Sequence, residues 1–362
     1  MFTILVIFIS LLLGSVSQSP FGERLDLGII DYSQLKEISG IAAGRVNKDI
    51  FWLHNDSGND NKIYAIDRSA KLKAVYVLKG IKLIDTEDIA IGLGPEKGEN
   101  YIYLADIGDN DATRDKKFIY RFKEPHIPSS DSVISAEIVD IDTLSFVFPD
   151  GKRDAETIMI DPLGMDIVIV SKRDENAHVY IANIPPRGSS ELNFKNIAHL
   201  PFGYEGFNNS GVTAGDIAGD GSEILIKTYS KVYYYRRLSG EELQETFSRK
   251  PVNVDYIMEP QGEALCFGAK NEGFYTTSES SPLNITPHLY FYRRISTGID
   301  EGYLPPAKLN LNDLNFANID IYSMEGKRLP DIKTAEDINT GMYFLKFTYD
   351  DTSFFRNVFI VK

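Results

Sequence analysis

A short segment recurs five times along the chain, and each copy opens on an acidic or hydroxyl-bearing residue followed by mainly apolar ones. The steps between copies are 50, 69, 57 and 50 residues. Such a period is typical of similar units that stack and bury their faces against one another. The copies are Glu37-Ile-Ser-Gly-Ile, Glu87-Asp-Ile-Ala-Ile, Glu156-Thr-Ile-Met-Ile, Thr213-Ala-Gly-Asp-Ile and Glu263-Ala-Leu-Cys-Phe.

Further strand-like segments follow each copy, separated by Gly, Asn, Asp and Pro clusters that favour turns. Second strands are expected at 50–54, 101–105, 167–171, 224–228 and 274–278. Third strands, each with Tyr at its third place, are expected at 62–67, 118–122, 178–182, 231–235 and 288–292. Fainter fourth strands are expected at 72–78, 136–141, 194–200 and 252–258.

Repeated antiparallel units of four strands predict an all-β fold, a β-propeller over residues 22–296. The fifth unit has no clear fourth strand after Arg294, and the segment 23–31 can supply it. Closure by an N-terminal strand would remove the exposed edges of an open array. The count is then five blades. The extra sequence at 143–150, inside the 69-residue step, keeps six blades as an alternative.

The charge composition of the chain indicates which kinds of partner it can bind. The formal net charge is −14, and so acidic a surface repels phosphate backbones, which argues against nucleic-acid binding. Cations are its natural partners, and we expect a monomer that binds a small-molecule or surface ligand. The single cysteine, Cys266, lies in an apolar run and is expected to be a buried, inert thiol.

The N-terminus predicts export. Residues 1–17 combine an apolar stretch at 2–13 with Ser15 and Ser17 at the places where signal peptidases require small residues. The stretch is too short to span a bilayer, and no later segment is long enough to be transmembrane. We therefore expect a signal peptide, passage through the periplasm, and a secreted or cell-surface protein.

The C-terminal part differs from the repeats. Residues 297–312 are expected to be a linker, and 313–362 a small antiparallel β-sandwich. Its motifs resemble the C-terminal sorting domain of the type IX secretion system of Bacteroidetes: Ile319-Asp-Ile-Tyr-Ser-Met-Glu-Gly-Lys, Ile338-Asn-Thr-Gly-Met-Tyr-Phe-Leu-Lys and Val358-Phe-Ile-Val-Lys. The resemblance implies the secretion machinery as a partner; an ordinary accessory sandwich is the alternative.

The first strands of propeller blades line the central channel, so equivalent residues of the copies should form a ring. That ring is expected to contain Glu37, Glu87, Glu156, Thr213 and Glu263. An 11-residue spacing to the second strand favours Thr213 over Asp216 in the fourth copy. Clustered carboxylates either hold protons or surround a cation, and oxygen ligands suit Ca²⁺. Structural capping of backbone groups is the alternative.

The loops after the second strands supply further candidates. Asp56, Asp106 and Asp109 lie in two similar Asp/Asn-rich loops and are possible Ca²⁺ ligands as well as ordinary turn residues. His54 ends a channel-side strand and is a candidate general base, with a structural role as the alternative. Four cations near the same end, Arg153, Lys172, Arg173 and Lys227, together with Thr213, are candidate substrate contacts.

The motif order over residues 35–295 resembles a group of secreted propellers similar to esterase-like, phytase-related propellers. The matching motifs are Glu37-Ile-Ser-Gly-Ile-Ala, His54-Asn-Asp-Ser-Gly, Glu87-Asp-Ile-Ala, Asp106-Ile-Gly-Asp-Asn, Ala155-Glu-Thr, Val212-Thr-Ala-Gly-Asp-Ile and Gln261-Gly-Glu-Ala. The resemblance implies acidic channel residues and Ca²⁺. It does not fix a reaction, and the phosphate-site residues of true propeller phytases are not matched.

Together these features predict a Ca²⁺-dependent hydrolase acting on an ester, lactone or phosphoester at the channel mouth. The expected catalytic residues are His54, Glu87 and Glu156, and the expected metal ligands are Glu37, Glu87, Glu156, Glu263, Asp56, Asp106 and Asp109. A non-catalytic module that binds a ligand or an ion is the alternative, because propeller scaffolds host both.

Overall fold

The computed structural model describes residues 19–56, 58, 61–130, 132–202, 211–280, 285–295, 319–322, 328–329, 341–349 and 352–360. Within it the chain divides into two units, Met1–Arg294 and Ile295–Lys362. The predicted signal peptide at 1–17 and linker at 297–312 lie outside the described residues.

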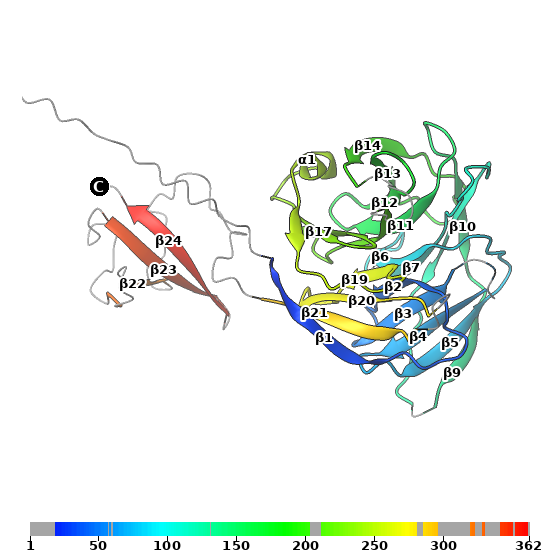
Figure 1. Ribbon diagram of the computed structural model, residues 1–362, viewed down its shortest axis with the longest axis horizontal. Helices are drawn as coiled ribbons and strands as arrows, with labels where there is room; N and C mark the ends of the chain where they lie inside the picture. The colour runs from blue at the N-terminus through cyan, green and yellow to red at the C-terminus, as the bar shows by residue number, and fades with distance from the viewer. Residues whose placement is uncertain are drawn as a thin grey trace, which may run out of the picture. The chain divides into compact units, whose positions relative to one another are not determined.

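The first unit is a five-bladed β-propeller (Figure 1). Its innermost strands pack against one another in chain order, and the last packs against the first, which closes the ring. They are β2 (Ile38–Ala43), β6 (Asp88–Leu93), β11 (Ala155–Asp161), β15 (Val212–Ile217) and β19 (Ala264–Phe267). The five expected repeats are therefore five blades.

The second and third strands lie where turn signals and apolar runs predicted them. The second strands are β3 (Ile50–Asn55), β7 (Asn100–Asp106), β12 (Asp166–Ser171), β16 (Glu223–Thr228) and β20 (Gly273–Thr277). The third strands are β4 (Lys62–Asp67), β8 (Lys117–Lys123), β13 (Ala177–Asn183), β17 (Val232–Arg236) and β21 (His288–Arg294). The outer strands of blades one, three and four are β5 (Leu72–Leu78), β14 (Lys195–Leu200) and β18 (Val252–Val254).

The N-terminal strand closes the fifth blade, as predicted. Strand β1 (Phe21–Ile29) pairs antiparallel with β21, with Phe21 opposite Arg294. Phe21 is buried and its ring lies edge-on to Phe274, with centroids 4.8 Å apart. The two ends of the propeller sequence therefore hold the ring shut by both backbone pairing and apolar packing.

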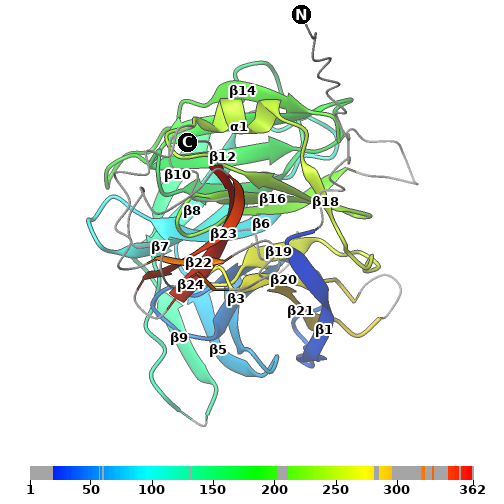
Figure 2. The same ribbon diagram turned by 90° about the vertical axis from the view of Figure 1, so that its left-hand side faces the viewer.

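The predicted fourth strand of blade two, at 136–141, is wrong. The outer strand of that blade is β10 (Asp142–Phe146), which pairs with β8. The preceding strand, β9 (Ile134–Ile138), instead pairs parallel with β5 of blade one (Figures 1 and 2). Apolar side chains at alternate positions of β9 pack onto the core of blades one and two. The extra residues in the 69-residue step thus form an added edge strand on blade one, and they do not form a sixth blade.

The hydrophobic core lies between successive blades. Ile158 and Ile160 of blade three, for example, share a cluster with Tyr101 and Tyr103 of blade two. Cys266 is buried in the cluster between blades five and one. A short helix, α1 (Leu243–Ser248), packs beside β14 through Leu243 and Phe247. No helix in the described part of the chain is long and apolar enough to cross a membrane.

In the second unit, β22 (Ile319–Tyr322), β23 (Gly341–Tyr349) and β24 (Thr352–Ile360) form one three-stranded sheet with antiparallel pairing. The antiparallel β-structure predicted for the C-terminal domain is thus present in the residues described there.

Candidate functional site

The start of each inner strand carries a β-bulge at one end of the channel. Register shifts leave Ser39, Glu156 and Thr213 as the extra residues in blades one, three and four. In blade two, Glu87 and Asp88 both oppose Ala105. In blade five, the pairing changes register between Gln261 and Ala264, which places Glu263 at the bulge.

The ring is therefore Ser39, Glu87, Glu156, Thr213 and Glu263. The predicted register was correct in four blades and wrong in the first, where Ser39 and not Glu37 takes the equivalent place. Ser39 lies 11 residues before Ile50, the same spacing as in the third, fourth and fifth copies. Glu37 was aligned with the acidic residues of the other copies, although Ser39 is the residue at the equivalent position.

The two hydroxyl members of the ring join neighbouring blades. Ser39 Oγ donates to the carbonyl of Glu87 at 2.6 Å. Thr213 Oγ1 donates to the carbonyl of Gly262 at 3.4 Å. Both hydroxyls are thus used in hydrogen bonds between blades. The ring members available to bind an ion or a substrate at the channel mouth are therefore the three carboxylates.

Two clusters of carboxylates meet at this mouth. Asp56, Asp85 and Glu87 form the outer cluster, and Glu87, Asp154 and Glu156 form the inner one. In each cluster the ligand oxygens lie within 4.8 Å of one another. The inner cluster is buried, whereas Asp56 and Asp85 are partly exposed. Glu87 belongs to both clusters and is the central residue of the site.

Asp85 and Asp154 were missed by the sequence reasoning, although both stand two residues before a ring carboxylate. Their positions in the repeat are equivalent, and each contributes an oxygen to a cluster that contains Glu87. Glu279 was also missed. Its N–H donates to the Gln261 carbonyl as the N–H of Asp56 donates to Glu37, so Glu279 is the blade-five counterpart of Asp56.

Lys172 is the buried cation of the site. Its Nζ lies 2.7 Å from Glu156 Oε1 and 4.0 Å from Glu263 Oε1. It also donates to the hydroxyl of Tyr229 at 3.3 Å. Burial opposes the charge of Lys172, but the carboxylates of Glu156 and Glu263 outweigh burial and hold its pKa well above the ordinary value.

Carboxylates outnumber cations among the described residues of the mouth, and burial together with this excess of negative charge raises the pKa values of Glu87 and Glu156. Burial and the nearby charges of Glu156, Asp56 and Asp85 raise the pKa of Glu87 well above its ordinary value. Burial, with the charges of Asp154 and Glu263, raises the pKa of Glu156 to about 8 despite Lys172. At neutral pH the mouth therefore holds protons where a cation could sit.

Glu263 and Glu279 are neighbouring carboxylates on the blade-five side of the mouth. Burial, with the neighbouring carboxylate of Glu263, raises the pKa of Glu279 to about 9. The Tyr229 hydroxyl donates to Glu263 Oε1. Tyr229 stands at the place in blade four that Lys172 holds in blade three, since each follows the last residue of its second strand.

Asp106 and Asp109 organise the loop beside the mouth. Asp106 accepts hydrogen bonds from the N–H of Ile84 at 3.1 Å and from the N–H of Asp85 at 3.0 Å. It also accepts one from the guanidinium of Arg114 at 2.8 Å. Asp109 accepts the N–H of Thr113 at 2.7 Å and pairs with Lys117 at 2.9 Å. Neither belongs to the two clusters, and their oxygens hold Asp85 and the loop in place.

His54 lies on β3 opposite Gly40 of β2, between blades one and two. It is buried, and its Nδ1 donates to the backbone carbonyl of Asn55 at 2.8 Å. Its Nε2 has no hydrogen-bond partner among the described residues and faces Gly40, where a Cβ would come within 2.5 Å. Burial lowers the pKa of His54 to about 4. Lys227 holds the equivalent place in blade four and donates to the Gly262 carbonyl.

The remaining candidates lie around the rim. Arg173 pairs with Asp154 at 2.6 Å. Arg153 is held by Asp174 at 2.8 Å and Asp150 at 3.2 Å, outside both clusters. Glu37 is partly exposed, and its charge contributes to the raised pKa of Glu279.

The donors of the two clusters are carboxylate oxygens alone, which is the chemistry of a hard divalent cation such as Ca²⁺. Comparison of the chain with protein-family models and with curated proteins found no match. The fold and these side chains are therefore what a functional proposal rests on.

Proposed function

We propose that the channel mouth binds Ca²⁺ and that the protein is an exported, Ca²⁺-dependent hydrolase of ester, lactone or phosphoester bonds. One observation carries the proposal: Glu87 is shared by two groups of three carboxylates, in a mouth where acids exceed cations. Burying uncompensated carboxylates is costly unless they are protonated or bound to a cation. A cation at Glu87 relieves the repulsion of both groups.

The outer cluster is the better place for the ion. The inner cluster already has Lys172 at Glu156 and Arg173 at Asp154. Asp56 and Asp85 are partly exposed, so an ion between them and Glu87 would keep positions open to water and substrate. A Ca²⁺ there would polarise a carbonyl or phosphoryl oxygen and lower the pKa of its water.

The chain's own residues then take distinct roles. Glu87, Asp56 and Asp85 hold the ion. Glu156, with a pKa raised to about 8, holds a proton at neutral pH and is placed to donate it to a leaving group. Lys172 would bind an anionic oxygen of the substrate, since its charge is maintained beside Glu156 and Glu263. His54 is given no proton-transfer role, because its ring is buried against Gly40 between two blades.

A second candidate is a binding module without catalysis. It is favoured by the burial of Glu87 and Glu156, which are about 5% and 3% exposed. Residues so enclosed could hold an ion purely to stabilise the channel. The two functions differ in whether the bound ion keeps an exchangeable position toward solvent.

The discriminating experiment is a panel of ester, lactone and phosphoester substrates with the full chain, in Ca²⁺ and in EDTA. Activity in Ca²⁺ that is lost in Asp56→Asn and retained in Asp154→Asn supports the hydrolase with its ion in the outer cluster. Ca²⁺ binding without turnover of any substrate supports the binding module. Glu137→Gln, an exposed carboxylate of β9, is the matched control.

The export part of the proposal rests on the sequence features at the two ends, the signal peptide at 1–17 and the resemblance of 313–362 to a type IX sorting domain. Fractionation of cells that express the full chain tests it. Protein retained inside cells after deletion of the C-terminal segment, and outside them with it, is the expected result. Equal distribution of the two forms would contradict the proposed secretion route.

A further inference from the structure

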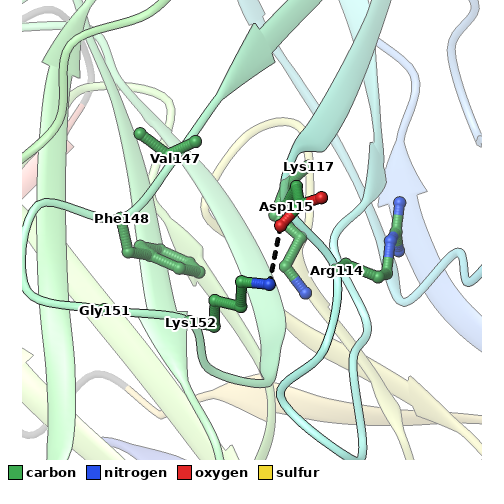
Figure 3. A pocket seen from close by; sticks show the side chains of 7 residues that line it. All are labelled: Arg114, Asp115, Lys117, Val147, Phe148, Gly151 and Lys152. Atoms are coloured by element: carbon green, nitrogen blue, oxygen red, sulfur yellow. Dashed lines mark ion pairs between the residues drawn. The ribbon is translucent and has the colours of Figure 1, made fainter.

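A pocket lies between the β7–β8 connection of blade two and the β10–β11 connection that leads to blade three (Figure 3). Its volume is about 190 Å³. A buried apolar cavity of about 150 Å³ holds a benzene molecule, so this pocket has room for one ring with a small substituent. None of its lining residues was a candidate in the sequence.

Two cations on the blade-two side of the pocket are already neutralised. Lys117 is buried and pairs with Asp109 at 2.9 Å. Arg114 pairs with Asp106 at 2.8 Å. Both also donate to the carbonyl of Gly108, which lies against the carboxylates of Glu87 and Asp85 at the mouth. This wall is therefore fixed and carries no excess charge.

Lys152 differs from these two cations. Its partner Asp115 lies 2.6 Å away, but the side chain of Asp115 is 91% exposed and that of Lys152 is 47% exposed. Figure 3 shows the pair across the pocket opening. An exposed ion pair contributes about 0–1 kcal/mol. An anion bound in the pocket can therefore replace Asp115 at Lys152 at little cost.

The facing wall is apolar. Val147 is 56% exposed, so its side chain is open to a ligand. Phe148 is held by ring contacts with Tyr180 at 4.5 Å and Phe146 at 5.2 Å between centroids. Phe148 is only 7% exposed, so a flat apolar group would pack mainly on Val147, against a wall that these ring contacts hold in place.

We propose that this pocket binds a small aromatic carboxylate, with its ring against Val147 and Phe148 and its charge on Lys152 in place of Asp115. This pocket is separate from the proposed hydrolase site, and ligand binding in it does not depend on Ca²⁺ at the channel mouth. Ring and charge are both needed, because the apolar wall alone offers no orientation, and Lys152, which also donates to the carbonyl of Thr113 at 2.9 Å, is an exposed amine whose ion pairs alone are weak.

The test is calorimetric titration of the full chain with benzoate and phenylacetate in EDTA, with benzamide as the neutral counterpart. We expect saturable binding of a carboxylate and about tenfold weaker binding of benzamide. Lys152→Gln should weaken carboxylate binding about tenfold. Asp115→Asn should strengthen it, because it removes the competing internal anion.

Lys79→Gln is the matched control, since Lys79 forms a comparable exposed pair with Glu137 at 3.0 Å in another blade. It should leave binding unchanged. Equal affinity for benzoate and benzamide, unchanged binding in Lys152→Gln, or no saturation at about 20 mM ligand would each overturn the proposal. All three variants alter exposed side chains, and circular dichroism checks that they fold.

Discussion

Lys172 Nζ lies 2.7 Å from Glu156 Oε1, and both side chains are almost completely buried. The pair stands at the centre of a channel mouth in which carboxylates outnumber cations. Its neighbours decide how the mouth responds to pH, to substitution and to divalent ions.

The stability of the metal-free protein should fall as pH rises. The folded-state pKa values of Glu156 and Glu279 are raised to about 8 and about 9, above the ordinary value for glutamate of about 4.3. The stability from these protonated groups is complete below about pH 4.3 and is lost as pH rises through about 8 and 9. Urea unfolding in EDTA at a series of pH values measures the loss.

Ca²⁺ should oppose this loss, because it binds where Glu87 otherwise holds a proton and so relieves the repulsion among the carboxylates of the mouth. The gain in melting temperature on adding Ca²⁺ should therefore be larger at pH 8 than at pH 6. A pH-independent gain, or stability in EDTA that is flat across this range, would contradict the proton–cation exchange.

Removal of Lys172 should be strongly destabilising. Breaking one side of a buried ion pair costs about 3–5 kcal/mol, because the other charge stays buried without a partner. We expect Lys172→Met to show a loss of this size in urea unfolding above pH 8, where Glu156, whose pKa is raised to about 8, has lost its proton. In the double variant Lys172→Met/Glu156→Gln, part of the loss should be recovered. Simple addition of the two single effects would mean that the side chains do not interact.

His54 should matter for stability and not for turnover. Its folded-state pKa is lowered to about 4 by burial, below the unfolded value of about 6.5. The stability gained by keeping it neutral is complete above about pH 6.5 and is lost as pH falls toward 4, by up to about 3 kcal/mol. His54→Gln should remove this acid-side dependence in urea unfolding. A large fall in kcat of that variant at pH 7, with its fold intact, would restore His54 as a catalytic candidate.

Closure of the ring depends on Phe21. This side chain is buried against Phe274 and Tyr234 of neighbouring strands. Phe21→Ala should lower the free energy of unfolding by about 3–5 kcal/mol. Leu25→Ala in the same strand alters a side chain that is 44% exposed, and it should change stability by at most about 0.5 kcal/mol. Equal effects of the two would show that backbone pairing alone closes the ring.

The repeat made most of the fold predictable. Inner, second and third strands carry apolar runs at a regular spacing, and turn residues mark their ends, so periodicity suffices for them. The outer strands are partly exposed along their length, which weakens the signal. The error in blade two has this cause: residues 134–138 alternate as a strand should, but nothing local says which blade they join.

The candidate site was only partly predictable. Glu87, Glu156, Thr213 and Glu263 were found because the repeat aligns them. Ser39 was missed because Glu37 offered a more attractive acid, and a bulge shifts the register by one residue. Asp85, Asp154 and Glu279 come from loop positions whose approach to the mouth depends on bulge geometry. His54 and Lys227 were candidates because their side chains can transfer a proton or bind an anion. They hold equivalent positions on their strands, and these positions place both side chains between blades.

The most direct test of the account is calorimetric titration of EDTA-treated wild type and Glu87→Gln with CaCl₂, in two buffers of different ionisation enthalpy. We predict wild-type binding with a Kd no weaker than the ~10⁻⁴–10⁻³ M of extracellular calcium modules, with net release of protons. Glu87→Gln should lose this binding. Wild type that binds no Ca²⁺ in this range, or Glu87→Gln that binds it unchanged, would contradict the assignment of the mouth as a Ca²⁺ site.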